Sequence, residues 1–252
     1  MSEAGESKAK TFVFPVRDLE SDRVRLTLFD STLNTQRLVD LSKTHPELFK
    51  YLPYGPFETP GEFNSVYEKW VSSEHRNVLF AIFDKTGGDG SPRYAGVVGL
   101  LNTSIINQCT EIGFITIFPG FQQTHVTANA VGLLLHYCLE LPSSINGKYG
   151  PGLGLRRVQW QTHEENVASV RAAERVGFRR EGLIRWQRAL LEGKYGVTVP
   201  PERAALYKNP GRHSWMLAVC WDDWELGGTR DFVQVQMERN KEKTHKLSCD
   251  GL

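Results

Sequence analysis

The chain has 252 residues, 40% of them hydrophobic, which is enough for one large domain or two small ones with a buried core. Its formal net charge of +1 excludes a general electrostatic attraction to nucleic acid or to acidic membranes. The four cysteines lie far apart without paired spacing, which argues against a zinc site or a disulfide framework and indicates reduced thiols.

In chain order, residues 1–10 come first, and they are charged and poor in apolar side chains, as are residues 239–252. We therefore expect two flexible tails around a single domain of residues 11–238. The N-terminus lacks the apolar region of a secretory signal, and no apolar stretch reaches the ~18 residues of a membrane-spanning helix. These features predict a cytoplasmic protein.

Within the domain, apolar runs rich in β-branched and aromatic residues predict strands, and apolar residues three or four apart predict helices. The expected strands are Val24–Phe29, Val78–Phe83, Tyr94–Leu101, Glu111–Phe118, Arg157–Thr162, Phe178–Trp186 and Ser214–Trp221. The expected helices are Thr32–Ser42, Thr59–Glu74, Thr127–Leu141, Asn166–Val176, which ends at Gly177, and Arg230–Glu238. Strands that are first adjacent and then alternate with helices indicate one mixed α/β sheet.

The segment FPGFQQTHVTANA, Phe118–Ala130, joins a predicted strand to a predicted helix. Backbone N–H groups and the helix dipole converge at such a junction, which makes it a common phosphate site. Phosphate loops are usually rich in glycine, yet this one has none after Gly120. Glycine is required only where φ is positive or a ligand touches Cα. Two interpretations stay open: an anion site of backbone amides from about Gln123 to Thr127, and an ordinary turn with Thr127 as helix N-cap.

Three polar residues stand out beside this loop. Glu111 heads an apolar strand, on a face shared with Gly113, Ile115 and Ile117, and is either a partly buried general base or a structural carboxylate. Asn166 and Ser169 share one helix face. They bind a ligand, or they serve as an N-cap and as a hydroxyl bonded to its own backbone.

Three motifs are considered together: YLPYGPF at 51–57, EIGF at 111–114, and a set of spaced residues between 166 and 185. The members of this set are Asn166, Ser169, Glu174, Gly177, Phe178, Glu181, Gly182 and Arg185. Over residues 20–190 the chain resembles the GNAT superfamily of acyl-CoA-dependent N-acetyltransferases, most closely the RimJ/RimL-like branch that acetylates N-termini of ribosomal proteins. It departs from the pattern at His125 and Thr127, where small residues are usual. It also departs at Ala173, where many members carry a tyrosine that acts as the general acid for the leaving thiolate.

The resemblance implies a GNAT-like α/β (α+β) fold, with a mixed, mostly antiparallel central sheet of about seven strands flanked by helices. It implies direct transfer of an acetyl group from acetyl-CoA to an amine, with no metal and no covalent intermediate. Expected acceptors are a small-molecule amine or a protein N-terminus, and neither nucleic acid nor a membrane is expected as a partner. The alternative is a degenerate GNAT scaffold that binds coenzyme A or another ligand without catalysis.

The resemblance also assigns roles to residues. The expected cofactor-binding residues are Phe118, Gln122, Gln123, Thr124, His125, Val126, Thr127, Asn166 and Ser169. Glu111 is the expected base, and Ser169 or water protonates the leaving thiolate in place of the missing tyrosine. The long connection 191–212 is expected to border the acceptor site, through Tyr195, Glu202, Arg203 and Tyr207.

Overall fold

The computed structural model describes residues 12–88, 90–144 and 147–239, so the tails predicted at 1–10 and 239–252 lie outside it, except for Arg239. Its strands are β1 (Leu19–Glu20), β2 (Val24–Leu28), β3 (Val78–Asp84), β4 (Arg93–Ser104), β5 (Cys109–Ile117), β6 (Arg157–His163), β7 (Arg179–Ala189) and β8 (Gly211–Cys220). They form one sheet in the order β1-β2-β3-β4-β5-β6-β8-β7, antiparallel except between β5 and β6. The predicted mixed, mostly antiparallel sheet is thus confirmed, with eight strands.

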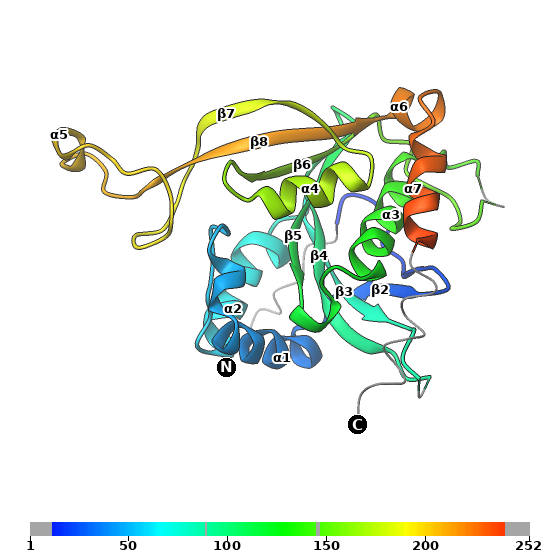
Figure 1. Ribbon diagram of the computed structural model, residues 1–252, viewed down its shortest axis with the longest axis horizontal. Coiled ribbons are helices and arrows are strands. Elements are labelled where there is room, and N and C mark those ends of the chain that lie inside the picture. Colours follow the sequence, from blue (N-terminus) through cyan, green and yellow to red (C-terminus); the bar gives the residue numbers. More distant parts are fainter. Residues whose placement is uncertain (1–11, 89, 145–146, 240–252) are drawn as a thin grey trace, which may run out of the picture.

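Helices cover both faces of the sheet (Figure 1). One side carries α1 (Ser31–Thr44), η1 (Pro46–Phe49), α2 (Pro60–Tyr67) and its π-helical continuation η2 (Glu68–Ser72). The other side carries α3 (His125–Leu139), α4 (Val167–Arg175), α6 (Trp221–Glu225) and α7 (Thr229–Glu238). The short η3 (Pro119–Phe121) follows β5, and α5 (Pro201–Ala204) lies at the tip of the long β7–β8 arm. No helix in the described ranges is both long and apolar enough to cross a membrane.

Two hydrophobic cores lie on opposite faces of the sheet, and β3 contributes to both. Val78, Phe80 and Ile82 pack in the core beneath α3, which we call the α3-side core. Leu79 and Ala81 pack in the core beneath α1 and α2, which we call the α1-side core. Because both faces are covered, the strand reads as a continuous apolar run rather than an alternating one.

A β-bulge interrupts β5 at Phe114, which has the left-handed φ of 56°, and the register with β4 shifts there. An extra residue reverses the side-chain alternation along a strand. Glu111 and Gly113 accordingly open onto the α1 side of the sheet, whereas Ile115 and Ile117 pack in the α3-side core. The prediction that these four residues share one face is therefore wrong.

The sheet separates between β5 and β6. The two parallel strands pair only where Cys109–Glu111 meets Arg157–Gln159, although β5 continues to Ile117 and β6 to His163. Glu111 is the last paired residue and stands at the closed end of the separation. Six further residues of β5 extend beyond it, roughly 20 Å of strand at ~3.3 Å per residue.

The end of α4 confirms the predicted glycine cap. Gly177 has a φ of 90° and its N–H donates to Glu174 O at 3.1 Å, while Phe178 N–H donates to Ala173 O at 3.1 Å. These two bonds form a Schellman motif, which ends the helix and turns the chain into β7.

At Gly96, the backbones of β4 and β5 approach closely beside the bulge, and a substitution there tests this packing. It has a φ of 149°, and an added Cβ would collide with the backbone oxygen of Thr116. We expect Gly96→Ala to lower the melting temperature by about 4–8 °C, which corresponds to ~2 kcal/mol of strain and overpacking. The matched control is Gly182→Ala in β7, because no atom lies within 4 Å of its added Cβ. Equal melting temperatures for the two variants would contradict the packing argument.

Candidate active site

The turn between β5 and α3 is shorter than predicted. Gln123 has a φ of 59° and reverses the chain, and α3 begins at His125. Thr124 is the N-cap, since its Oγ1 accepts a hydrogen bond from Val126 N–H at 3.3 Å. The interpretation with Thr127 as N-cap is therefore wrong by three residues, because His125, Val126 and Thr127 already belong to the helix.

His125, the residue in the usual glycine position, directs its imidazole into the protein. Its Nε2 lies 3.0 Å from Asp84 Oδ1, and both side chains are almost completely buried. Arg93 also contacts Asp84, at 2.6 Å from Oδ2. Burial by itself would raise the pKa of Asp84, but hydrogen bonds from His125, Thr86 and Arg93 outweigh burial and hold that pKa well below its usual range. A large residue is accommodated here because its side chain leaves the outer side of the turn open.

The backbone of this turn presents free donors. Among the described residues, no acceptor lies within hydrogen-bond distance of the N–H groups of Gln123, Thr124, His125 and Thr127. Positive φ is confined to Gln123 within this turn. Free N–H groups at a helix N-terminus, reinforced by the helix dipole, are the elements of a backbone anion site.

Two other residues predicted to contact a cofactor have structural duties. Gln122 donates through Nε2 to Ile117 O at 3.0 Å, which braces the turn. The ring of Phe118 is buried in the α1-side core, 4.9 Å from the ring centroid of Tyr94. Only the backbone of Phe118 therefore lies near the turn.

The N-terminus of α4 lies beyond the end of β6, as that of α3 lies beyond the end of β5. Asn166 is its N-cap, and its Oδ1 accepts from Ser169 N–H at 3.1 Å. Trp160 Nε1 donates to Ser169 Oγ at 3.0 Å, so the Ser169 hydroxyl proton remains available for donation. Because β5 and β6 are parallel, the two helix N-termini meet at the same sheet edge, where open α/β sheets bind ligands.

A cavity of about 290 Å³ surrounds Glu111 on the α1 side of the sheet. Its wall combines the YLPYGPF segment, η2, β4, β5, β6 and the arm strands β7 and β8. Tyr54 and Phe114 stack on each other in this wall, with ring centroids 4.3 Å apart. Segments that are distant in sequence thus meet at the closed end of the strand separation.

Glu111 is 5% exposed and accepts a hydrogen bond from Asn102 Nδ2 at 3.0 Å. Burial raises the pKa of this carboxyl, while the Asn102 hydrogen bond and the charges of Arg188 and Arg212 oppose the increase without cancelling it. Among the described residues, no cation lies within ion-pair distance of Glu111. A glutamate in solvent or in an ion pair does not fit this geometry, and the role of Glu111 as a base stays a prediction.

The sequence analysis missed the charged and amide residues that line the cavity beside Glu111: Lys69, Glu74, Asn77, Asn102, Gln161, Arg188 and Arg212. Asn102 has a left-handed φ of 52°, and Asn is one of the few residues that tolerate it, so an Asn at the end of a strand was the available signal. Gln161, Arg188 and Arg212 come from three different strands and carry no local pattern. Their convergence depends on the sheet topology alone.

The long connection between β7 and β8 touches the YLPYGPF segment at its base. Lys194 Nζ donates to the carbonyl oxygens of Phe49 at 2.7 Å, Gly55 at 2.9 Å and Tyr54 at 3.2 Å. Burial lowers the pKa of Lys194. Tyr195 packs against Tyr51 and His163, which also contact each other.

The predictions for the rest of that connection differ from the structure. None of the four residues expected to border the acceptor site lines the cavity around Glu111, and three of them are exposed towards the tip of the arm (Figure 1). Arg203 donates to Tyr207 at 3.0 Å there, and Glu202 belongs to α5. The arm carries them away from the body of the domain.

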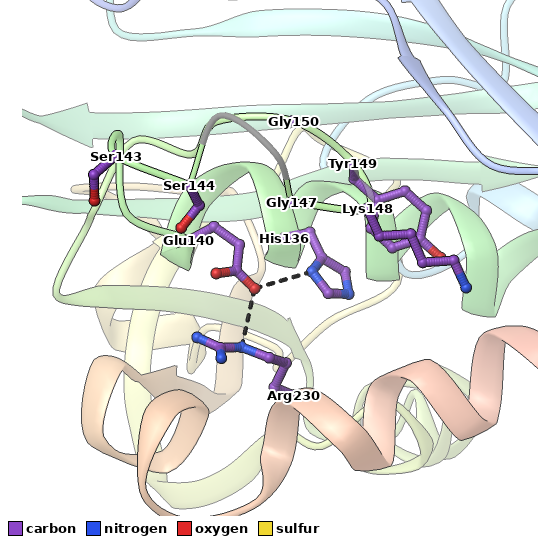
Figure 2. A pocket seen from close by; sticks show the side chains of 9 residues that line it. All are labelled: His136, Glu140, Ser143, Ser144, Gly147, Lys148, Tyr149, Gly150 and Arg230. Atoms are coloured by element: carbon purple, nitrogen blue, oxygen red, sulfur yellow. Dashed lines mark hydrogen bonds and ion pairs between the residues drawn. The ribbon is translucent and has the colours of Figure 1, made fainter.

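A second cavity, of about 440 Å³, lies beside the C-terminal end of α3, away from the strand separation. Glu140 contacts two other ionisable side chains of this cavity, His136 and Arg230 (Figure 2). Glu140 Oε1 lies 3.3 Å from His136 Nδ1 and 3.0 Å from Arg230 Nε. Burial lowers the pKa of His136 to about 4, helped by the positive charges of Arg230 and Lys148. Among the described residues, α7 alone contributes a helix N-terminus to this cavity, so the cavity around Glu111 is the stronger candidate for the active site.

One group of potential metal ligands occurs in the described part of the chain: Cys220, Asp222 and Asp223. Asp223 already contacts Arg179 at 2.6 Å and accepts from Cys220 N–H at 3.1 Å, which caps α6. The arrangement is explained by this helix start.

Comparisons with known proteins agree with this geometry. The family model described as "Acetyltransferase (GNAT) domain" matches residues 23–179. No curated protein matches the chain. Among solved structures, a GCN5-related N-acetyltransferase from Brucella melitensis is similar, with 26% identity, a TM-score of 0.66, and coverage of 88% of this chain and 85% of that chain.

Two more distant structures share the fold. RimJ of Mycobacterium smegmatis, in complex with CoA-disulfide, has 15% identity, a TM-score of 0.61, and coverage of 87% of this chain and 93% of that chain. Spermidine N-acetyltransferase of Vibrio cholerae, in complex with CoA and spermine, has 16% identity, a TM-score of 0.55, and coverage of 81% and 99%.

The buried carboxyl of Glu111 makes a stability prediction. A carboxyl with a raised folded-state pKa destabilises the fold above its unfolded pKa, and the penalty disappears as the pH falls through that range. We therefore expect Glu111→Gln, which keeps an acceptor for Asn102, to raise the melting temperature at pH 8. The gain should shrink as the pH is lowered towards 5. A variant less stable than the parent at pH 8 would contradict the burial argument.

Proposed function

The chain belongs to the GNAT acetyltransferase family, and we propose that it transfers an acetyl group from acetyl-CoA to an amine by direct attack. One observation carries the proposal: the unpaired ends of β5 and β6 lead from two helix N-termini to a buried carboxyl beside a cavity. The CoA bound in the Mycobacterium smegmatis and Vibrio cholerae structures supports acetyl-CoA as the co-substrate.

In this proposal the pyrophosphate lies at the N-terminus of α3. The free N–H groups of Gln123, Thr124, His125 and Thr127 bind it, with helix-end effects of ~0.3–1 kcal/mol each, rising to ~2 kcal/mol when partly buried. The Gln122 side chain and Phe118 hold the turn in place rather than contact the phosphates. The pantetheine arm extends along the separation between β5 and β6, where Asn166 Nδ2 is free to donate.

The reaction takes place at the closed end of the separation. The amine nitrogen attacks the thioester carbon, a C–N bond forms, and the C–S bond breaks to release the thiolate. We assign stabilisation of the developing oxyanion to backbone N–H groups near the Phe114 bulge. Glu111 accepts the proton that the amine loses, directly or through water, and Ser169 or water protonates the thiolate.

The energetic demand on the base depends on the acceptor. At pH 7, deprotonation costs about 1.4 kcal/mol for an α-amine of pKa ~8 and about 4.6 kcal/mol for a lysine-type amine of pKa ~10.4. A carboxyl with a raised pKa is suited to deprotonate the α-amine, which has the smaller deprotonation cost. The RimJ/RimL-like motifs similarly favour an α-amine, whether on a small molecule or on a protein N-terminus.

The first test addresses binding. We expect acetyl-CoA and CoA to raise the melting temperature of the protein, and pantetheine, which lacks the pyrophosphate, to raise it much less. Asn166→Asp keeps an N-cap acceptor but loses the amide donor, so it should leave the ligand-free melting temperature nearly unchanged and weaken CoA binding about tenfold. Equal shifts with CoA and pantetheine would argue against the pyrophosphate site.

The second test addresses catalysis. Free thiol release from acetyl-CoA, measured with a panel of amines, should exceed background for at least one amine. Glu111→Gln should lower kcat by about 10²–10⁴-fold without weakening acetyl-CoA binding, because proton transfer by a positioned base contributes a factor of this size. The control is Glu225→Gln, a change at an exposed residue of α6. Binding without turnover for every amine would favour the degenerate, non-catalytic scaffold.

A further inference from the structure

Two guanidinium groups from the arm strands reach the cavity around Glu111. Arg212 of β8 is 5% exposed, and its Nε donates to Ser214 Oγ at 2.8 Å. Arg188 of β7 lies over the ring of Trp70, 5.8 Å from its centroid. In the described part of the chain, neither guanidinium has a carboxylate within ion-pair distance.

The charges around the cavity do not balance. Its two carboxylates are Glu111 and Glu74, and Glu74 is already engaged by Arg76 in two contacts of 3.0 Å. Burial, followed by repulsion from Arg188, lowers the pKa of Arg212 to about 10, so Arg212 keeps its positive charge at pH 7. Arg212 is buried and Arg188 is half-buried, so their mutual repulsion is costly, and an anion bound to both would reduce that cost.

We infer that the acceptor is an amine that also carries a carboxylate, of the size of a free amino acid, and that Arg188 and Arg212 bind this carboxylate. This inference rests on the proposed acetyl transfer and names its substrate class. A guanidinium presents paired N–H donors that match the two oxygens of a carboxylate. A cavity of about 290 Å³ suits a small ligand.

Within the described structure, the cavity also contains hydrogen-bond acceptors without donors. Gln161 Oε1 is buried and, among the described residues, has no hydrogen-bond partner. One oxygen of Glu111 is engaged by Asn102, and the other has no donor in the described structure. These two acceptors are suited to the N–H groups of the amine, so the cavity offers complementary groups for both ends of a zwitterion.

The same charges argue against two other acceptors. A polyamine would bring further cations next to two arginines, which costs free energy. A protein N-terminus presents a neutral amide where a free amino acid presents a carboxylate, and so leaves the guanidiniums without an anion. Both acceptors are included as outcomes of the test.

The experiment compares matched amines in the acetyl-CoA thiol-release assay. The panel contains the twenty free amino acids, the carboxamide of each, spermidine, and a short peptide with a free N-terminus. We expect at least one free amino acid to be acetylated with a kcat/KM at least tenfold above that of its carboxamide, and spermidine and the peptide to be poorer still. A carboxamide, spermidine or the peptide as the preferred acceptor would overturn the inference.

Variants then assign the preference to the arginines. Arg188→Gln should raise KM for the preferred amino acid about tenfold or more, with a small change in kcat, and leave its carboxamide unaffected. Arg188→Lys should restore part of the loss because it keeps the charge but not the paired donors. Arg175→Gln, at an exposed arginine of α4, is the charge-matched control. An unchanged KM in Arg188→Gln would also overturn the inference.

Failure of the inference is separable from failure of the proposed function. The shift in melting temperature with acetyl-CoA tests the proposed function without any acceptor. Turnover of an amine that lacks a carboxylate likewise tests acetyl transfer without the inferred carboxylate site. A clear shift with turnover only of amines that lack a carboxylate would remove the inference and keep the acetyltransferase. Absence of both the shift and any turnover would remove both.

Discussion

The structure depends on one broken ladder: β5 and β6 stop pairing at Glu111 and diverge. Backbone N–H and C=O groups normally find partners, because an unpaired buried group costs about as much as a lost hydrogen bond. Strands that separate inside a sheet therefore create a demand for a polar ligand or water along their length. The α3 N-terminus adds its own free donors at the open end, and Asn166 at the start of α4 adds a side-chain amide.

The hydrogen bond between His125 and Asp84 allows this arrangement to exist without glycine. A turn that approaches a phosphate usually has small residues because a side chain would occupy the ligand's space. Here the imidazole is directed inward to a buried carboxylate, so the backbone N–H remains on the outer side. The same device ties the start of α3 to the end of β3, and thus stabilises the turn that the anion would contact.

The closed end of the separation combines two opposite electrostatic environments. Around Glu111, burial favours the neutral carboxylic acid and raises the pKa of the carboxyl, which makes it a stronger base. In the same cavity, Arg188 of β7 and Arg212 of β8 have no carboxylate partner within the described structure. Lys194 connects the base of the arm to Phe49 and to the YLPYGPF segment through three hydrogen bonds. These bonds fix the arm relative to that wall of the cavity.

The sequence by itself determined the order and type of nearly all elements, because period, capping and turn chemistry are local. The Asn166 cap and the Gly177 C′ position of α4 are confirmed to the residue for this reason. Local patterns gave wrong predictions at two places. At the Phe114 bulge an extra residue reverses the side-chain alternation of the strand, and α3 begins earlier than its sequence pattern indicates. Only the tertiary structure decided the chemistry of the cavity, since Asn102, Gln161, Arg188 and Arg212 meet through the strand order, and no spacing along the chain encodes which strands become neighbours.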